Sequence, residues 1–151
     1  MPMDETSMTE ALGMIRDAGD VANLRAAVMR ALGLCGIEAA YFVAPLTRDS
    51  RAERSMTNIG LPPEWEQRYR EERYRVDPLP SLSLRHSNAF CWPGDVDTGE
   101  LTKPQSSYLE YAAQFGLARG IGVACYGPQG RAGFLGAVWS QIEPPTDAAQ
   151  L

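Results

Sequence analysis

Apolar positions recur along this chain at two spacings, one typical of helices and the other typical of strands. Near the N-terminus, the helical spacing predicts a short amphipathic helix over residues 7–17 and a stronger helix after Asp20. Asp20 has the side chain of a helix N-cap, and Gly33 or Gly36 ends the second helix. The apolar positions at this spacing are Leu12 and Ile15, then Val21, Leu24, Val28 and Leu32.

Short runs of apolar, β-branched and aromatic residues predict strands in the rest of the chain. The first is long and buried, the second is shorter, and a charged loop over residues 47–54 separates them. The last two are joined by Gly127-Pro-Gln-Gly130, whose residue types are typical of a hairpin turn. The predicted strands are residues 37–45, 55–59, 89–92, 120–126 and 132–139.

A helix is predicted between the second and third strands. Pro62-Pro63 suits its first turn, where a missing N–H costs nothing, and the helix continues to about Arg75. Glutamates precede arginines at i,i+4 on its outer side, which is the favourable order for helical ion pairs. Trp65 and Tyr69, one turn apart, are therefore predicted to point inward.

Local signals also place the remaining elements. Asp77 precedes a proline, which disfavours helical geometry, so it is predicted at a chain reversal before a short helix over residues 79–85. Thr102 and Gln105 match a capping box that opens a helix ending at Gly116. Thr146 is the predicted cap of one more helix in the tail. This order of helices and strands predicts one α/β (α+β) domain, a layered sandwich with a largely antiparallel sheet.

Composition narrows the class of protein. A chain of 151 residues suits a single domain, and a net charge of −5 argues against a nucleic-acid-binding surface. Three widely spaced cysteines indicate reduced thiols rather than a disulfide framework. The N-terminus lacks the features of a signal peptide, and no apolar run is long enough to span a bilayer. We therefore expect a cytoplasmic protein that does not contact membranes.

The residues that would support catalysis are scarce, so we expect no enzyme, although carboxylate-only mechanisms stay open. The single histidine, His86, is interpreted as a solvated loop residue, and no set of ligands has zinc spacing. A nucleophile elbow, a P-loop and a complete Gly-x-Gly-x-x-Gly are absent from the sequence. The acidic loop around Asp95 lacks the spacing of a calcium loop. We expect no cofactor and no metal.

The chemically most specific segment runs from Leu61 to Trp92. It combines large apolar side chains with the indole N–H of Trp65 and the carboxylate of Asp77, as an enclosed site for a small amphipathic molecule requires. Inward aromatic residues one turn apart are also common in an ordinary core, and an Asp before Pro is usually a turn residue. The pattern alone leaves both interpretations open.

The spacing of these residues resembles the LuxR family, specifically the autoinducer-binding domain of quorum-sensing transcription regulators that respond to N-acyl-homoserine lactones. Pro62-x-x-Trp65-x-x-x-Tyr69 is followed by Asp77-Pro and Trp92, then by Phe115-Gly-Leu-x-x-Gly120. The resemblance covers residues 8–140 in element order and implies an α-β-α sandwich with a five-stranded antiparallel sheet. It also implies a small-molecule autoinducer as ligand and a homodimer, or a heterodimer with a related regulator.

The resemblance implies roles for individual residues. Trp65 would donate to the lactone carbonyl, Asp77 would accept from the ligand amide, Tyr69 would pack along the acyl chain, and Trp92 would wall the lactone end. Phe90 belongs to the same segment, and Gly120 matches a glycine kept where strand and pocket meet. The ligand-binding residues predicted in this way are Leu61, Trp65, Tyr69, Asp77, Leu79, Phe90, Trp92, Gly120 and Gly136.

Three of these positions depart from the family pattern. Leu61 stands where many members have a tyrosine that bonds the acyl carbonyl, Leu79 where Thr or Ser is common, and Gly136 where a serine sometimes occurs. A more apolar pocket is expected. Members of the family also continue into a helix-turn-helix domain, so residues 1–151 are expected to be the sensory domain without that C-terminal domain. A ligand-blind dimerisation module that sequesters a full-length regulator is the alternative function.

Overall fold

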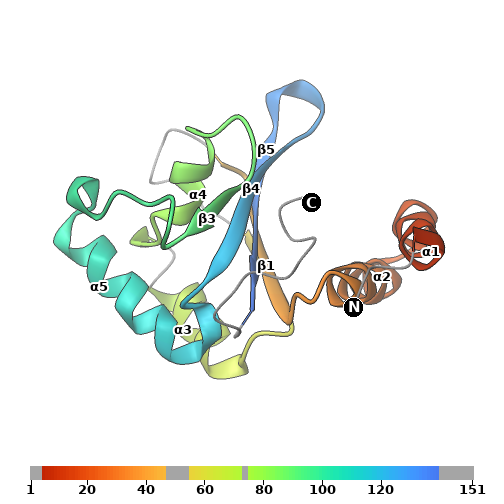
Figure 1. The fold of residues 1–151 in the computed structure, drawn as a ribbon, viewed down its shortest axis with the longest axis horizontal. Coiled ribbons are helices and arrows are strands. Elements are labelled where there is room, and N and C mark those ends of the chain that lie inside the picture. Colours follow the sequence, from red (N-terminus) through yellow and green to blue (C-terminus); the bar gives the residue numbers. More distant parts are fainter. Residues whose placement is uncertain (1–4, 47–54, 73–74, 140–151) are drawn as a thin grey trace.

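The chain forms a five-stranded antiparallel sheet with helices on both faces, seen in the computed structural model, which describes residues 5–46, 55–72 and 75–139 (Figure 1). The strand order is β2-β1-β5-β4-β3, and every neighbouring pair runs antiparallel. The strands are β1 (Ala39–Ala44), β2 (Ser55–Ile59), β3 (Phe90–Trp92), β4 (Gly120–Tyr126) and β5 (Ala132–Val138). The predicted α-β-α sandwich is confirmed.

Helices α1 and α2 lie on one side of the sheet, and α3, α4 and α5 lie on the other (Figure 1). The α-helices are α1 (Glu5–Arg16), α2 (Val21–Leu34), α3 (Pro63–Glu71), α4 (Leu79–Ser83) and α5 (Lys103–Ala112). Shorter helical turns are η2 (Thr98–Glu100), η3 (Ala113–Leu117) and η4 (Pro128–Gly130). None of the described helices is long and apolar enough to cross a membrane.

Alternation along the strands divides the interior into two cores, because successive side chains point to opposite faces. On β1, Tyr41 and Val43 belong to the core beneath α3, α4 and α5, whereas Ala40 belongs to the core on the α2 side. The first core contains most of the large aromatic side chains, and the second contains mainly aliphatic ones around Leu32 and Ile121. The candidate site lies in the first core.

The N-terminal helices form as predicted, but their large apolar side chains do not all pack inward. Asp20 caps α2 by accepting from the Asn23 backbone N–H at 2.7 Å. Leu12 is 55% exposed and Val21 69% exposed, whereas Ala11 and Ala27 are buried. Of the predicted apolar positions, Val28 and Leu32 do pack against the core on this side of the sheet, whereas Leu12, Val21 and Leu24 are exposed.

Other element boundaries differ from the predictions by a few residues. Helix α3 ends at Glu71 rather than near Arg75. The capping box of Thr102 and Gln105 is present at the start of α5, and the helix passes into η3, where Gly116 has φ +93°. That conformation favours glycine and ends the helical segment. The predicted loop over residues 47–54 and the predicted tail helix beginning at Thr146 lie outside the described residues.

Candidate ligand-binding site

A buried carboxylate, Asp77, lies between α3 and α4 beneath the sheet. It is 5% exposed, and one of its oxygens, Oδ2, accepts hydrogen bonds from the hydroxyls of Tyr41 and Tyr69, each at 2.9 Å. The other oxygen, Oδ1, accepts the backbone N–H of Leu79 at 3.0 Å. The last bond joins the Asp77 side chain to the backbone two residues further on, which stabilises the turn that precedes α4. The carboxylate is thus held by three donors from three parts of the chain.

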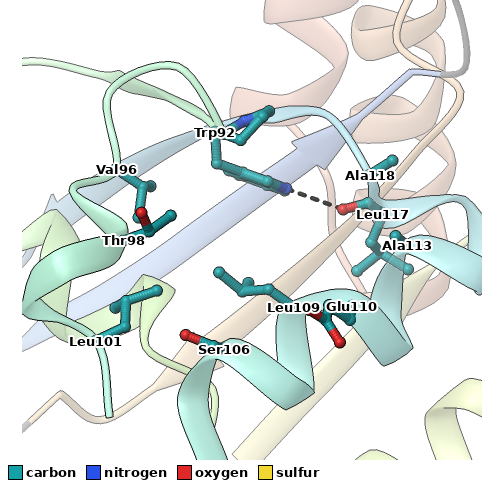
Figure 2. Close-up of a pocket in the computed structure, with 11 residues that line it drawn as sticks. Trp92, Val96, Thr98, Leu101, Ser106, Leu109, Glu110, Ala113, Leu117 and Ala118 are labelled. Atoms are coloured by element: carbon teal, nitrogen blue, oxygen red, sulfur yellow. Dashed lines mark hydrogen bonds between the residues drawn. The ribbon is translucent and has the colours of Figure 1, made fainter. Parts of the chain in front are cut away.

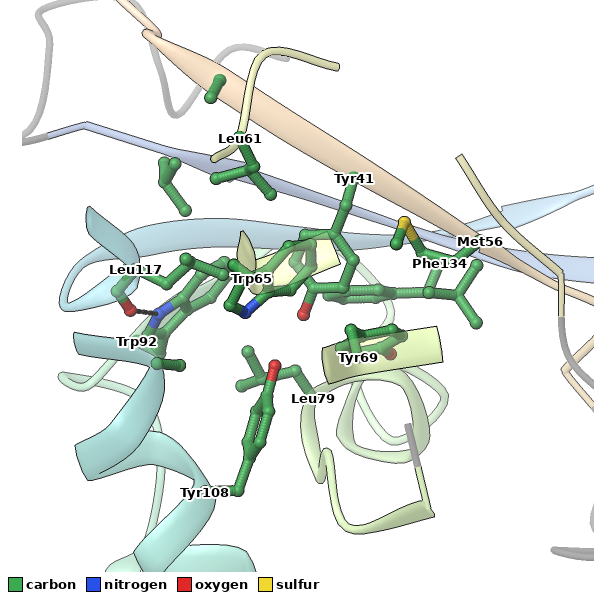
Figure 3. Packing of buried hydrophobic residues seen from close by; sticks show 14 of the residues in the cluster. Tyr41, Met56, Leu61, Trp65, Tyr69, Leu79, Trp92, Tyr108, Leu117 and Phe134 are labelled. Carbon is green, nitrogen blue, oxygen red and sulfur yellow. Dashed lines mark hydrogen bonds between the residues drawn. The ribbon is translucent and has the colours of Figure 1, made fainter. Parts of the chain in front are cut away.

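Near this carboxylate, aromatic rings pack against one another, mostly edge to face; Figure 3 shows the rings. Tyr41 lies at the centre, with its ring centroid 5.2 Å from Trp65, 5.7 Å from Tyr69 and 5.6 Å from Phe134. The ring centroid of Tyr108, on α5, lies 6.3 Å from that of Tyr69. Edge-to-face packing places positive ring edges against negative ring faces and adds to the area that is buried. We call these five residues, with Asp77, the aromatic cluster.

Two polar groups of the aromatic cluster make no well-aligned hydrogen bond with the described residues. They are the indole Nε1–H of Trp65 and the hydroxyl of Tyr108, and both side chains are fully buried. Figure 3 shows the Trp65 nitrogen and the hydroxyls of Tyr108 and Tyr41 pointing toward one another. A buried donor without a partner costs about 1–3 kcal/mol, so such a pair indicates a place for an acceptor.

Burial and the nearby carboxylate keep the tyrosines of this cluster protonated. Desolvation raises the pKa of Tyr41 well above its ordinary value, and the negative charge of Asp77 adds to that shift. Desolvation likewise raises the pKa of Tyr108, with a further contribution from the charge of Asp77, while weak hydrogen bonds with Tyr41 and Trp65 lower it. Both hydroxyls therefore remain neutral hydrogen-bond donors at physiological pH.

Trp92 packs at the edge of the same core, and its N–H is already used. Its Nε1 donates to the Leu117 carbonyl at 3.0 Å, which fixes the ring over β4 (Figures 2 and 3). A Cβ at Gly120 would lie 2.2 Å from the Trp92 ring, so only glycine admits this ring here. Trp92 is therefore placed to act as an apolar wall, and Gly120 provides the space for it.

A second glycine on the sheet, Gly136, also lies against aromatic rings. Gly136 pairs with Tyr41 across β5 and β1, and a Cβ at Gly136 would lie 2.7 Å from the Tyr41 ring. The rings of Tyr41 and Phe134 occupy the space above this glycine. The surroundings of Gly136 are therefore apolar and aromatic, and its contact with a ligand stays a prediction.

The remaining predicted site residues lie in the same core. Leu61 and Leu79 are buried, and Leu79 contributes its backbone N–H to Asp77. Phe90 is buried above Gly122 and stacks on His86 with centroids 4.8 Å apart. His86 lies in a loop, as predicted, but the stacking partly shields its side chain from solvent. The structure brings the predicted residues together beneath one face of the sheet.

A cavity of about 380 Å³ lies beside the aromatic cluster, between Trp92 and the outer part of α5 (Figure 2). Its wall is mostly apolar, and Ser106, Thr98 and Glu110 supply its polar groups. Trp92 is the one predicted site residue on its wall, and Trp65 and Asp77 are not part of that lining. The apolar residues of the wall are Trp92, Pro93, Val96, Leu101, Leu109, Ala113, Leu117 and Ala118.

Sequence reasoning missed Tyr41 and Tyr108. Tyr41 lies in the middle of an otherwise apolar strand, where a hydroxyl that is buried must find a partner within the protein. Tyr108 follows the capping box by six positions, on the inner side of α5. A tyrosine at a predicted core position was thus the available signal. No group of His, Cys, Asp or Glu in the described part of the chain is arranged to hold a metal ion.

An α-β-α sandwich that carries a few convergent polar groups in an aromatic core, with an adjacent apolar cavity, has the architecture of a small-molecule-binding domain. The sequence profile of the family described as "Autoinducer binding domain" matches residues 20–151. The chain belongs to the autoinducer-binding domain family. No curated protein matches its sequence.

Solved structures of LuxR-type regulators share the fold. An N-acylhomoserine-lactone-dependent LuxR family transcription factor, CepR2 from Burkholderia cenocepacia, aligns with a TM-score of 0.79 and 19% identity, over 99% of this chain and 86% of its own. Escherichia coli SdiA aligns with a TM-score of 0.71 and 15% identity, over 91% of this chain and 56% of its own. SdiA in complex with octanoyl-rac-glycerol aligns with a TM-score of 0.71 and 14% identity, over 95% of this chain and 58% of its own.

Proposed function

We propose that this chain is the sensory domain of a quorum-sensing receptor and binds an N-acyl-homoserine lactone or a similar small amphipathic signal. The observation that carries the proposal is the pair of buried donors, Trp65 Nε1–H and Tyr108 O–H, which make no well-aligned hydrogen bond and lie beside a buried carboxylate. An ordinary core satisfies such groups or replaces them with apolar ones. A ligand oxygen between these donors would supply the missing acceptor.

In this proposal the polar and apolar parts of the ligand have separate places. Trp65 donates to a ligand carbonyl, Asp77 stands ready to accept from a ligand amide, and Tyr69 packs along the chain. Trp92 walls the head group, above Gly120. The apolar tail extends toward the cavity of about 380 Å³, where each buried CH₂ contributes about 0.8 kcal/mol. A cavity of this size lies near the lower end of the usual range of about 300–1,000 Å³, which favours short tails.

The relatives are consistent with a ligand of this kind. CepR2 is described as dependent on N-acylhomoserine lactones, and SdiA has been solved with octanoyl-rac-glycerol. Both ligands join a polar head to an acyl chain through an acyl carbonyl. The same chemistry would satisfy the orphaned donors of the aromatic cluster here.

Thermal unfolding with a panel of acyl lactones of different chain length tests the proposal. A ligand present at about 100 times its dissociation constant should stabilise the folded protein by about 2.7 kcal/mol. Trp65→Phe should remove most of that stabilisation, because the ring remains but the donor is lost. Trp139→Phe is the matched control, since Trp139 is also buried with an unpartnered N–H but lies in the second core.

Two results would contradict the proposal. One is a folded wild-type sample that no acyl lactone stabilises. The other is an equal ligand-induced shift in Trp65→Phe, Trp139→Phe and the wild type, which would remove Trp65 from the site. Mass spectrometry of small molecules that co-purify with the protein provides an independent identification of the ligand.

A second candidate function is a dimerisation module that pairs with a related regulator without sensing a ligand. Large apolar side chains on the outer surface of α1 and α2 favour it, since such patches often mark protein interfaces. They are Leu12, Met14, Val21, Leu24 and Met29. Sedimentation of the protein alone and with a full-length relative tests this function. A strict monomer in both experiments would count against it.

A further inference from the structure

A network of hydrogen bonds ties helix α3 to the edge strand β2. We call its three side chains the α3 clamp: Asn58 on β2, and Glu66 and Arg70 on α3. None of the three belongs to the aromatic cluster or to the cavity wall. Building on the proposed function, we infer that the α3 clamp is the positioning unit of the binding site. It fixes α3 on the sheet and so sets the affinity for the ligand without touching it.

The first part of the α3 clamp shapes the turn between β2 and α3. Asn58 accepts the Leu61 N–H at its Oδ1, at 2.7 Å, and donates from Nδ2 to the Leu61 carbonyl oxygen at 2.9 Å. Gly60, within this turn, has φ +90°, a conformation that favours glycine. The same Nδ2 also donates to Oε2 of Glu66 at 3.2 Å. One amide side chain therefore joins the strand, the turn and the first turn of α3.

The second part of the α3 clamp holds the helix one turn further along. Arg70 donates from Nη2 to the Met56 carbonyl oxygen at 2.7 Å and to Oε1 of Glu66 at 3.0 Å. The planar guanidinium presents several donors at fixed angles, so it can bind both acceptors at once. Hydrogen bonds from Asn58 and Arg70 hold the pKa of Glu66 below its ordinary value, so this acceptor is ionised at physiological pH. Two turns of α3 are thus attached to β2, at residues 56 and 58.

The α3 clamp supplies what burial alone does not. Helix α3 has nine residues, and Pro62 at its start provides no side-chain cap. Burial of Trp65 and Tyr69 draws the helix onto the sheet, but apolar contact is not directional. Hydrogen bonds do have a direction, which fixes the rotation and height of α3.

The members of the clamp on α3 are placed next to the residues that they position. Glu66 follows Trp65 in the sequence, and Arg70 follows Tyr69. A binding site has to hold its contact groups within about 0.5 Å of the productive geometry. A small rotation of α3 would therefore move both aromatic side chains out of place for the ligand.

The test compares two glutamates in the first turn of α3. Glu66→Ala opens the α3 clamp, whereas Glu64→Ala removes the exposed ion pair with Arg68 and the same charge near the helix N-terminus. Octanoyl-homoserine lactone is titrated into each variant by calorimetry. We expect binding about three- to tenfold weaker in Glu66→Ala and within about twofold of the wild type in Glu64→Ala. Glu66→Gln keeps an acceptor oxygen and should recover part of the loss.

A measurement without ligand separates positioning from a general loss of structure. Each of the three tryptophans gives an indole N–H signal in nuclear magnetic resonance spectra. Glu66→Ala should shift the signal of Trp65. The signals of Trp92, which is held by the Leu117 carbonyl, and of Trp139, in the second core, should stay in place. Glu64→Ala should leave all three unchanged.

The inference requires both effects. Equal binding by Glu66→Ala and Glu64→Ala would overturn it while the proposed function stands. An unmoved Trp65 signal in Glu66→Ala, or an equal change of all three signals, would also overturn it, because α3 would then not be what Glu66 positions. If octanoyl-homoserine lactone does not bind the folded wild type, the proposed function fails for this ligand and the claim about affinity fails with it.

Discussion

Tyr41 determines how a carboxylate can remain buried in this core. Its hydroxyl and that of Tyr69 converge on the same oxygen of Asp77, and Tyr41 comes from a strand 36 residues away in the sequence. A buried carboxylate is costly unless donors surround it. The tyrosines thus link β1 and α3 through one acidic group, and they also form the aromatic wall of the candidate site.

Tyr41→Phe is therefore expected to lower the free energy of unfolding by about 1.5–3 kcal/mol, the cost of losing a hydrogen bond to a charged group. The ring and its packing remain, so the loss reports the hydroxyl. Urea denaturation followed by tryptophan fluorescence measures the effect. Tyr126→Phe is the control, because Tyr126 is 70% exposed and should leave the stability unchanged. Equal stability of Tyr41→Phe and the wild type would mean that Asp77 does not depend on this donor.

At the scale of single residues, the sequence predicted some of the site residues but not all of them. Trp65, Tyr69 and Asp77 were identified from spacing. The burial of Trp65 and Tyr69 agrees with the prediction that they face inward, and Asp77, predicted at a chain reversal, is buried as well. Their ligand contacts stay a prediction. Tyr41 and Tyr108 were not identified, because the pattern places them in buried elements but does not show which distant groups their hydroxyls will meet.

At the scale of elements, the contact between β3 and β4 sets the position of Trp92. Trp92 pairs with Gly120 in the antiparallel ladder, and its indole reaches across to the Leu117 carbonyl at the end of η3. The glycine leaves room for the ring, and the hydrogen bond fixes its orientation. One tryptophan therefore joins β3, β4 and η3, and forms the boundary between the core and the cavity.

Gly120→Ala should disturb this junction. The added Cβ would lie 2.2 Å from the Trp92 ring and 2.6 Å from the Ala137 backbone oxygen, so it has no room to adjust. Overpacking of this kind costs about 1–3 kcal/mol or more, and we expect the upper end of that range. Chemical denaturation measures the loss, and near-ultraviolet circular dichroism reports displacement of the indole.

Gly33→Ala provides the control for that substitution. Gly33 lies within α2, and a Cβ there has nothing within 4 Å. Alanine is the better helix former by about 0.5–1 kcal/mol, so this variant should be slightly more stable than the wild type. If both alanine variants behaved alike, the close approach of Trp92 to Gly120 would not be the cause of the destabilisation.

At the scale of the whole molecule, the buried tyrosines should make the free energy of unfolding fall as the pH rises into the alkaline range. Burial and Asp77 raise the pKa of Tyr41, and burial raises that of Tyr108, above the unfolded-state value of about 10. Above about pH 10, these two hydroxyls therefore keep their protons in the folded protein, whereas the same groups lose them in the unfolded chain. This contribution is fully present below pH 10 and is lost as the pH rises further, by about 1.4 kcal/mol per pH unit for each tyrosine.

Urea denaturation at several pH values between about 9 and 11 measures this dependence. The slope of stability against pH above 10 should be shallower in Tyr41→Phe by about one tyrosine's contribution, whereas Tyr126→Phe should match the wild type. A Tyr41→Phe slope equal to that of the wild type would show that Tyr41 is not shielded from titration in the folded state.

Local sequence signals sufficed for the framework of this protein. Helix caps at Asp20 and Thr102, the period of apolar residues and the glycine-containing turns gave the order of elements and the sandwich, because these signals act within a few residues. Errors arose where partners lie far apart in the chain. The bond of Asp77 to Tyr41 spans 36 residues and that of Trp92 to Leu117 spans 25, so packing of the sheet against α3 and α5 governs which donors are satisfied, which remain open and where the cavity lies.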